Sequence, residues 1–347
     1  VTVCVLTSPH ALGLAIPLVI AVSTAIGARQ GLLIRNRTQF EGARLLDAVV
    51  FDKTGTLTEG RFAVKRVVSF GDRSEDDVLR HAAALEAQSE HPIGKGIVEK
   101  AGEKDLDLPD ASQFETIPGK GAQATVEDRS VKVVSRSYLE ENGIDFDTAK
   151  ADELSGEGNT LGFVLIDDEL AGIVALADVV RESSKEAIER LRDMDIEIMM
   201  ITGDSESVAK SVADELGLDD YFAEVLPDKK ADKIKELRND GRRVAMVGDG
   251  VNDAPALAEA DVGIAIGAGT DVAMETADVV LVESDPRDVA RTVELSRATW
   301  RKMVQNLWWA AGYNIVAIPL AAGVLAWAGI VLPPAVGALV MSVSTVV

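Results

Sequence analysis

The sequence is poor in cysteine, in basic residues and, at both ends, in charge of either sign. Its single cysteine, Cys4, excludes an internal disulfide framework, and the charged part of the chain is therefore expected in a reducing compartment. Lysine and arginine number 35 against 57 aspartate and glutamate residues, which gives a net charge of -22 over 347 residues. This deficit of positive charge argues against a nucleic-acid partner.

Charged residues are missing from residues 1–28 and 303–347, so the whole acidic excess lies between them. Because about 20 apolar residues are enough to cross a bilayer, the sequence predicts one transmembrane helix over 1–28 and two over 303–347, the last incomplete. Arg29, Arg35 and Arg37 follow the first segment, which indicates that residues 29–302 are cytoplasmic at a cell membrane. The chain is then expected to be a piece of a longer multi-pass protein whose N-terminal part is missing. The alternative for each apolar segment is a buried core helix.

A break in the first apolar segment, Ser8-Pro9-His10, marks a candidate metal pathway. Pro9 leaves the Val5 carbonyl without its helical donor, and such a group at membrane depth requires protein or a polar cavity around it. His10 adds an ionisable side chain at the break, which is typical of functional sites in membranes. The predicted ligands of a transported metal are Ser8, His10, Tyr313, Asn314, Met341 and Ser342. For each of them the alternative is a structural role in a kinked or hydrogen-bonded helix.

The central part of the chain alternates strands and helices. Strands are expected over 48–52, 196–201, 243–247, 261–266 and 277–282, and helices over 39–46, over 207–216 and from 226 onward. A segment of mixed helix and strand, residues 65–172, interrupts this alternation after the first strand. The pattern predicts a doubly wound α/β domain formed by 29–64 and 173–302, with an inserted α+β domain at 65–172.

Asp52 ends the first of these strands and precedes a turn of threonine and glycine. Open α/β sheets place their reactive groups at the carboxyl ends of strands. With Lys53 beside it and hydroxyls and backbone amides around it, Asp52 is suited to attack a phosphoryl group and carry it as an aspartyl phosphate. The alternative is a strand that simply ends in an Asp-Lys turn.

Other strand ends supply what this chemistry needs, namely a cation and a rigid electrostatic cradle for the phosphoryl group. Hard oxygen atoms are the ligands that Mg²⁺ prefers, and the predicted ligands are Asp52, Thr54, Asp249 and Asp253. Thr202-Gly203-Asp204 and the point charge of Lys229 suit the transferring phosphoryl group. Each motif alone is more often a loop, so the prediction depends on their order along the chain.

The residue two positions after Asp52 separates phosphatases from pumps. Soluble phosphatases of the haloacid dehalogenase-like superfamily, which this arrangement resembles, usually carry a second aspartate there as general acid and base. This chain has Thr54, and a hydroxyl cannot activate water as a carboxylate does. We therefore expect a long-lived phosphoenzyme, which a pump requires.

Three motifs resemble the phosphorylation signatures of the P-type ATPases: Asp52-Lys53-Thr54-Gly55-Thr56, Thr202-Gly203-Asp204 and Gly248-Asp249-Gly250-Val251-Asn252-Asp253-Ala254-Pro255. A fourth, Ser89-Glu90-His91-Pro92, narrows the resemblance to the heavy-metal subgroup. The resemblance implies ATP and Mg²⁺ as cofactors, a haloacid dehalogenase-like phosphorylation domain, and further spans and an actuator domain that precede this chain. It also implies that Glu86 and His91 hold the adenine end of ATP in a pocket lined by Gly119 and Gly121.

Two motifs depart from the pattern of the subgroup. Val134-Ser135 stands where a Gly-Asn pair is common, which affects polar contacts at one edge of the nucleotide pocket. The segment around His10 most resembles the Cys-Pro-His branch, the CopB-like copper exporters, but Ser8 replaces the motif cysteine. Loss of that thiolate moves the expected preference toward Cu(II) or Zn(II) over Cu(I), unless Cys4, one helical turn earlier, faces the same site.

The leading hypothesis is an ATP-driven heavy-metal transporter, with copper as the expected cargo, that forms an aspartyl phosphate. A pump for zinc, cobalt or cadmium is the first alternative. A membrane-anchored phosphatase that transports nothing is the second, and Thr54 and the inserted domain both argue against it.

Overall fold

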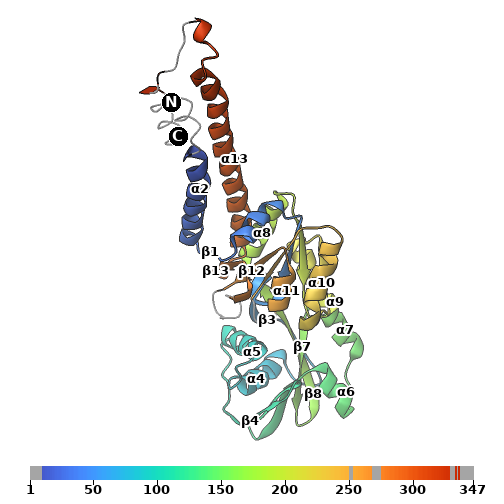
Figure 1. Cartoon of the computed structure of the whole chain (residues 1–347). Helices are drawn as coiled ribbons and strands as arrows, with labels where there is room; N and C mark the ends of the chain where they lie inside the picture. Colours follow the sequence, from blue (N-terminus) through green and yellow to red (C-terminus); the bar gives the residue numbers. More distant parts are fainter. Residues whose placement is uncertain (1–9, 250–252, 268–274, 329–332, 334, 337–347) are drawn as a thin grey trace.

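The computed structural model describes residues 10–249, 253–267, 275–328, 333 and 335–336. Two sheets divide them into two units, and strands β3 and β8 run between the units (Figure 1). Helices α2 (His10–Arg29) and α13 (Arg287–Ala321) lie side by side and extend away from the first unit.

The first unit is built on a seven-stranded sheet whose order is β1-β13-β12-β11-β2-β9-β10. Its strands are β1 (Leu32–Ile34), β2 (Ala48–Asp52), β9 (Glu197–Ile201), β10 (Asp220–Phe222), β11 (Val244–Gly248), β12 (Val262–Ile266) and β13 (Val279–Leu281). All neighbours pair in parallel except β1, which is antiparallel to β13. The five predicted strands are all present, and the edge strands β1 and β10 are additions.

Helices cover both faces of this sheet (Figure 1). They are α3 (Arg37–Gly42), the short turn η1 (Ala43–Leu45), α8 (Glu182–Arg192), α9 (Glu206–Leu216), α10 (Pro227–Asn239) and α11 (Ala254–Glu259). Strand β2 is buried along its whole length: Val49 and Phe51 pack into one apolar cluster and Ala48 and Val50 into the other. Continuous burial of a parallel strand explains why the run before Asp52 is apolar at every position.

The second unit is an antiparallel sheet of six strands in the order β3-β8-β7-β6-β5-β4. Its strands are β3 (Thr58–Ser69), β4 (Ala111–Ile117), β5 (Gly121–Val126), β6 (Arg129–Val134), β7 (Thr160–Ile166) and β8 (Glu169–Val180), and its helices are α4 (Glu75–Glu86), α5 (Pro92–Glu103), α6 (Arg136–Asn142) and α7 (Thr148–Gly156). The predicted boundaries of the inserted domain, 65 and 172, fall inside β3 and β8.

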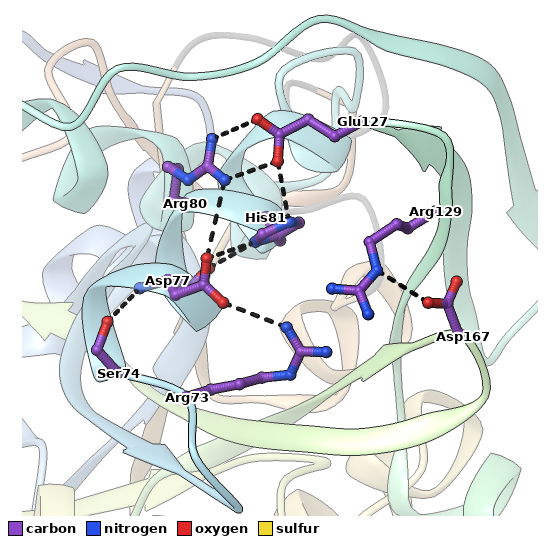
Figure 2. A network of polar contacts seen from close by, with 8 residues as sticks. All are labelled: Arg73, Ser74, Asp77, Arg80, His81, Glu127, Arg129 and Asp167. Atoms are coloured by element: carbon purple, nitrogen blue, oxygen red, sulfur yellow. Dashed lines mark hydrogen bonds and ion pairs between the residues drawn. The ribbon is translucent and has the colours of Figure 1, made fainter.

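Two hairpins of this sheet are held to each other and to α4 by charged side chains (Figure 2). Both hairpins turn on two residues with positive φ, Glu127-Asp128 and Asp167-Asp168, as two-residue turns matched to strand twist require. Arg80 of α4 pairs with Glu127 at 2.7 Å, and Arg129 pairs with Asp167 at 2.9 Å (Figure 2). These contacts orient the hairpin turns, although exposed pairs add little stability.

Neither α2 nor α13 has the character of a membrane span over its whole length. Within the described residues, no helix combines the length and the apolar character that crossing a bilayer requires. Helix α13 carries charged residues as far as Lys302 and is free of charge only beyond it. The transmembrane segments predicted over 1–28 and 303–347 therefore stay predictions, and part of each lies outside the described residues.

Gly96 provides a test of how α5 packs on β3. A Cβ atom at Gly96 would lie 2.0 Å from the carbonyl oxygen of Phe62 in β3, whereas one at Gly102 of the same helix would meet nothing within 4 Å. We expect Gly96→Ala to lower the free energy of unfolding of the second unit by about 1–3 kcal/mol. Gly102→Ala, the matched control, should raise it by about 0.5–1 kcal/mol because alanine is the better helix former. Urea denaturation with hydrogen exchange in α5 measures both, and equal effects would contradict this packing.

Candidate functional site

The three central strands of the first sheet end together and bring separate motifs to one place. Strand β2 lies between β11 and β9 and is parallel to both, with Asp52 opposite Ile201. Asp52 ends β2, Thr202 follows β9, and Asp249 follows β11. Residues that are far apart along the chain therefore meet at one edge of the sheet, as the parallel order predicts.

The turn after Asp52 explains the glycine in its motif. Thr54 has φ -76° and ψ 122°, and Gly55 has φ 77° and ψ -11°. These values are those of a type II turn, which requires a residue with positive φ at its third position. Gly55 meets that requirement without strain, and the chain reverses directly beside the Asp52 carboxylate.

A cavity of about 270 Å³ lies over these strand ends. Its lining includes seven of the residues predicted for phosphoryl transfer and magnesium binding: Asp52, Thr54, Thr202, Gly203, Asp204, Asp249 and Asp253. Val225, Pro227 and Lys230 complete it. Gly250, Val251 and Asn252 of the same motif lie outside the described residues.

Lys230, and not the predicted Lys229, is the lysine of this cavity. Its Nζ lies 2.5 Å from Asp52 Oδ1 and 2.7 Å from Asp253 Oδ1, and all three side chains are buried. Lys229 is 63% exposed and pairs with Asp232 on the surface. The buried face of α10 consists of Lys230, Ile234 and Leu237, and this helical spacing is the signal that distinguishes the two lysines.

Burial makes this cluster electrostatically strained. Burial, then repulsion by Asp253, raises the pKa of Asp52 from 3.8 to about 7, although Lys230 acts in the opposite direction. Burial likewise raises the pKa of Asp253. Loss of water disfavours the Lys230 ammonium, but attraction to the two carboxylates outweighs it and raises its pKa. One lysine therefore does not fully compensate the buried acidic groups, and a further cation would relieve them.

The donor set fits a magnesium ion in its chemistry. Asp52, Asp249 and Asp253 offer carboxylate oxygens that converge on one cavity, and hard oxygens in excess negative charge suit Mg²⁺. Within the part of the chain that the structure describes, no three carboxylate, histidine or cysteine side chains form a ready metal site by themselves. The ammonium group of Lys230 lies between the carboxylates of Asp52 and Asp253, in contact with both.

Lys53 stands beneath the cavity and joins β2 to the neighbouring elements. Its Nζ lies 2.8 Å from Asp204 Oδ2 and 3.4 Å from Asp178 Oδ2. Asp178 in β8 also accepts a hydrogen bond of 2.6 Å from the Thr58 hydroxyl. Thr202 donates its hydroxyl to Asp204 at 2.9 Å. Lys53 thus fixes the Thr-Gly-Asp loop relative to Asp52 without lining the cavity itself.

Asp178 and Arg181 are site residues that sequence reasoning missed. Arg181 donates from Nε to the Thr58 carbonyl at 2.9 Å and from Nη2 to the Gly55 carbonyl at 3.2 Å. Ser184 donates to the Leu57 carbonyl at 2.8 Å. The end of β8 therefore holds the backbone of the Asp52 turn. A lone aspartate within the apolar run of β8 was the available signal, because buried charges are retained only with partners.

The residues predicted to hold adenine line a second cavity, of about 430 Å³, in the six-stranded sheet. The predicted set Glu86, His91, Gly119 and Gly121 is joined there by Val134 and Ser135, the pair that departs from the subgroup. Glu86 is buried at the end of α4, and burial raises its pKa. His91 caps α5 through Nδ1, which accepts from the Ile93 amide at 3.3 Å.

Gly121 shows why a glycine is needed beside this second cavity. It has φ 141°, and a Cβ atom there would lie 2.0 Å from the Val133 carbonyl oxygen. Gly119 has φ 69° with open space around it. The turn between β4 and β5 can therefore lie close to β6 only with glycine at position 121.

The predicted ligands of a transported metal are not brought together by the described residues. Ser8, Met341 and Ser342 lie outside them, as does Cys4. His10 begins α2, and Tyr313 and Asn314 lie in α13, but the structure does not describe these three side chains. Their role stays a prediction.

Similarity to known proteins agrees with this geometry. The family model of the haloacid dehalogenase-like hydrolases matches residues 46–261. The copper-exporting P-type ATPase B of Archaeoglobus fulgidus is 60% identical over 100% of this chain and 50% of its own length. That of Enterococcus hirae is 46% identical over 100% of this chain and 47% of its own. The chain thus spans about half the length of the curated relatives it matches.

Solved structures of heavy-metal ATPases are also similar to this chain. A zinc-transporting PIB-type ATPase in its E2.Pi state gives a TM-score of 0.83 at 34% identity, over 97% of this chain and 54% of that one. The catalytic domain of the CPx-ATPase CopB-B gives 0.63 at 30% identity, over 77% of this chain and 97% of that one. With its haloacid dehalogenase-like phosphorylation domain and its nucleotide-binding unit, the chain belongs to the heavy-metal P-type ATPase family.

Proposed function

We propose that this chain is the catalytic part of a pump that exports copper at the expense of ATP through a phosphorylated Asp52. The observation that carries the proposal is the position of Asp52: it ends the central strand, is buried, and faces a cavity that also contains Thr202, Lys230 and Asp253. An electrostatic cradle of this kind is what phosphoryl transfer requires of a protein.

In the proposed reaction a carboxylate oxygen of Asp52 forms a bond to the γ-phosphorus of ATP. The bond from that phosphorus to the β,γ-bridging oxygen breaks, and ADP leaves with the electron pair. Lys230 stabilises charge on the phosphoryl oxygens, and Thr202 with its adjoining backbone amides orients them. Asp52, Thr54, Asp249 and Asp253 would hold Mg²⁺, which supplies positive charge against the phosphate groups when bound.

Adenine would bind in the cavity of the second unit. Glu86 and His91 supply its polar contacts, and Gly119 and Gly121 let the backbone approach the nucleotide. The lining of this cavity supports the assignment, because all four residues contribute to it. It is largely apolar apart from a few polar side chains, as small-molecule sites generally are.

The proposed membrane location rests on sequence and family. The ends of the chain carry no charge over residues 1–28 and 303–347, and exposed tryptophans lie on α13 at positions 308 and 309. Tryptophan is enriched where proteins meet the membrane surface. Residues 29–302 would then be cytoplasmic, the transported metal would bind near Pro9, and the earlier part of the same protein would complete the membrane domain.

Copper is the proposed cargo because the relatives that match the whole chain are named as copper-transporting. Zinc is the second candidate, favoured by the 34% identity to a zinc-transporting ATPase and by Ser8 at the motif position. A phosphatase without transport is disfavoured, because Thr54 faces the cavity where such enzymes place a general base.

Asp52→Asn tests the nucleophile. The full-length protein should form an acid-stable, alkali-labile phosphoenzyme from γ-labelled ATP, and the variant should form none, since an amide oxygen is not a competent nucleophile at this site. Labelling that survives the substitution would overturn the mechanism.

The thermal stability of Asp52→Asn shows whether the variant is folded. A carboxyl group whose pKa is 3.8 unfolded and about 7 folded favours the folded state while protonated, and that contribution is lost as pH rises between about 4 and 7. In a chelator, Asp52→Asn should therefore melt at a higher temperature than the wild type at pH 8, with a smaller difference at pH 5.

Lys230→Ala and Lys229→Ala form a matched pair of neighbouring substitutions. Removing Lys230 should slow phosphoenzyme formation by on the order of 100-fold, because it takes away a preorganised charge from a buried site. Lys229→Ala should leave the rate unchanged, since that side chain faces solvent. Rapid-quench labelling measures both rates, and the opposite ranking would restore Lys229 as the site lysine.

Metal dependence separates a pump from a phosphatase. ATP turnover by the full-length protein in vesicles should rise with Cu(I) or Cu(II) and less with Zn(II), Co(II) or Ag(I). A phosphatase that transports nothing would be indifferent to all five. Stimulation by Zn(II) above copper would favour the second candidate.

A further inference from the structure

A second class of ligand is indicated where α13 leaves the first unit. A cavity of about 410 Å³ lies there, away from both sites described above. Its lining residues are Arg44, Leu45, Arg297, Trp300, Arg301 and Val304. None of them lines the cavity at Asp52 or the second cavity, which contains Glu86 and His91.

Two elements build this cavity. Arg297, Trp300, Arg301 and Val304 follow the spacing i, i+3, i+4 and i+7, so they share one face of α13. Arg44 and its neighbour come from the short turn η1, which packs against α13. The cavity is therefore fixed by a regular helix face and a turn that leads directly into β2.

The cavity concentrates positive charge in a strongly acidic chain. Three of its six lining residues are arginines and none is acidic. Arg44 donates to the Glu41 carbonyl, and Arg297 donates to the Met194 carbonyl at 3.1 Å. Among the described residues none of the three arginines forms an ion pair, whereas Arg287 at the start of the same helix pairs with Asp285 and Glu186. Uncompensated guanidinium groups in one place suit a phosphate group.

An aromatic contact preorganises one of these arginines. The Arg44 guanidinium lies over the Trp300 ring, 4.0 Å from its centroid, and stacking of this kind leaves the edge donors of the guanidinium available. Trp300 itself is 44% exposed. A half-exposed tryptophan beside arginines is typical of the level at which a helix enters a membrane.

The position of the cavity along α13 agrees with a location at the membrane surface. Lys302 is the last charged residue of the chain, and Val304 lies in the uncharged part that follows it. From Trp300 to the exposed Trp308 is about 12 Å along the helix axis at 1.5 Å per residue. If the uncharged half of α13 enters the bilayer, as the proposed function requires, the three arginines lie at its cytoplasmic headgroup layer.

We propose that this cavity binds the phosphate of an anionic phospholipid from the cytoplasmic leaflet. Arg44, Arg297 and Arg301 hold the phosphate, Trp300 packs against the glycerol backbone, and Val304 begins the apolar surface along which an acyl chain lies. The inference rests on the proposed function, because it needs α13 to be membrane-inserted.

The test uses the full-length protein in nanodiscs of phosphatidylcholine with or without phosphatidylglycerol. Native mass spectrometry of the released protein reports which lipid it retains, and wild type should retain phosphatidylglycerol in preference. Arg297→Gln with Arg301→Gln should weaken that preference by roughly 30-fold, at about 1 kcal/mol for each basic residue. Arg301→Gln alone changes an exposed side chain that forms no hydrogen bond or ion pair within the described residues, and it should weaken the preference by roughly 5-fold.

A matched control removes the same charge elsewhere. Arg66→Gln with Arg129→Gln changes two exposed arginines of the six-stranded sheet and should retain phosphatidylglycerol as wild type does. Equal loss in this control, no preference in wild type, or displacement of the lipid by inorganic phosphate alone would each overturn the proposal. Phosphoenzyme formation in the same nanodiscs separates it from the proposed function: lipid loss with intact phosphorylation concerns this cavity only, and absence of phosphorylation in wild type refutes the function itself.

Discussion

The buried contact of Lys230 with Asp52 and Asp253 is the constraint on which the catalytic unit depends. Three charged side chains lie together at the end of a fully buried strand, where each would be costly alone. The fold must therefore place the ends of β2, β11 and α10 so that these three side chains are within contact distance of one another. That demand explains the continuous apolar run of β2 and the glycine in the turn after it, because neither could vary without moving the carboxylate.

Much of the fold followed from local pattern. The apolar runs that end at Asp52, Ile201 and Gly248 are buried on both sides, and such runs are readable in a sequence. Edge strands β1 and β10 have three residues each and half-exposed positions, so they carry little periodic signal. The predicted helix over 39–46 divides into α3 and η1 at Ala43, a boundary that depends on tertiary packing.

The sequence predicts the site residues that directly follow a strand. It does not predict those that reach the site through contacts between distant parts of the chain. The lining of the cavity at Asp52 contains the predicted aspartates and threonines. The choice between Lys229 and Lys230 needed the helix face of α10, which is set by Ile234 and Leu237. Asp178 reaches Lys53 from 125 positions away, a pairing that no local pattern contains. The arginines around Trp300 likewise meet Arg44 only through folding.

In the part of the chain that the structure describes, the two sheets are connected through strands β3 and β8. The pairing of these strands shifts register between Thr58 and Phe62 and between Val64 and Arg66. Arg181, directly after β8, binds the carbonyls of Gly55 and Thr58. These contacts join the end of β8 to the Asp52 turn, so bending of the strand pair would displace that turn. ATP that occupied both cavities would link the two units and restrain this bending. A phosphate donor without adenine would leave the bending unrestrained.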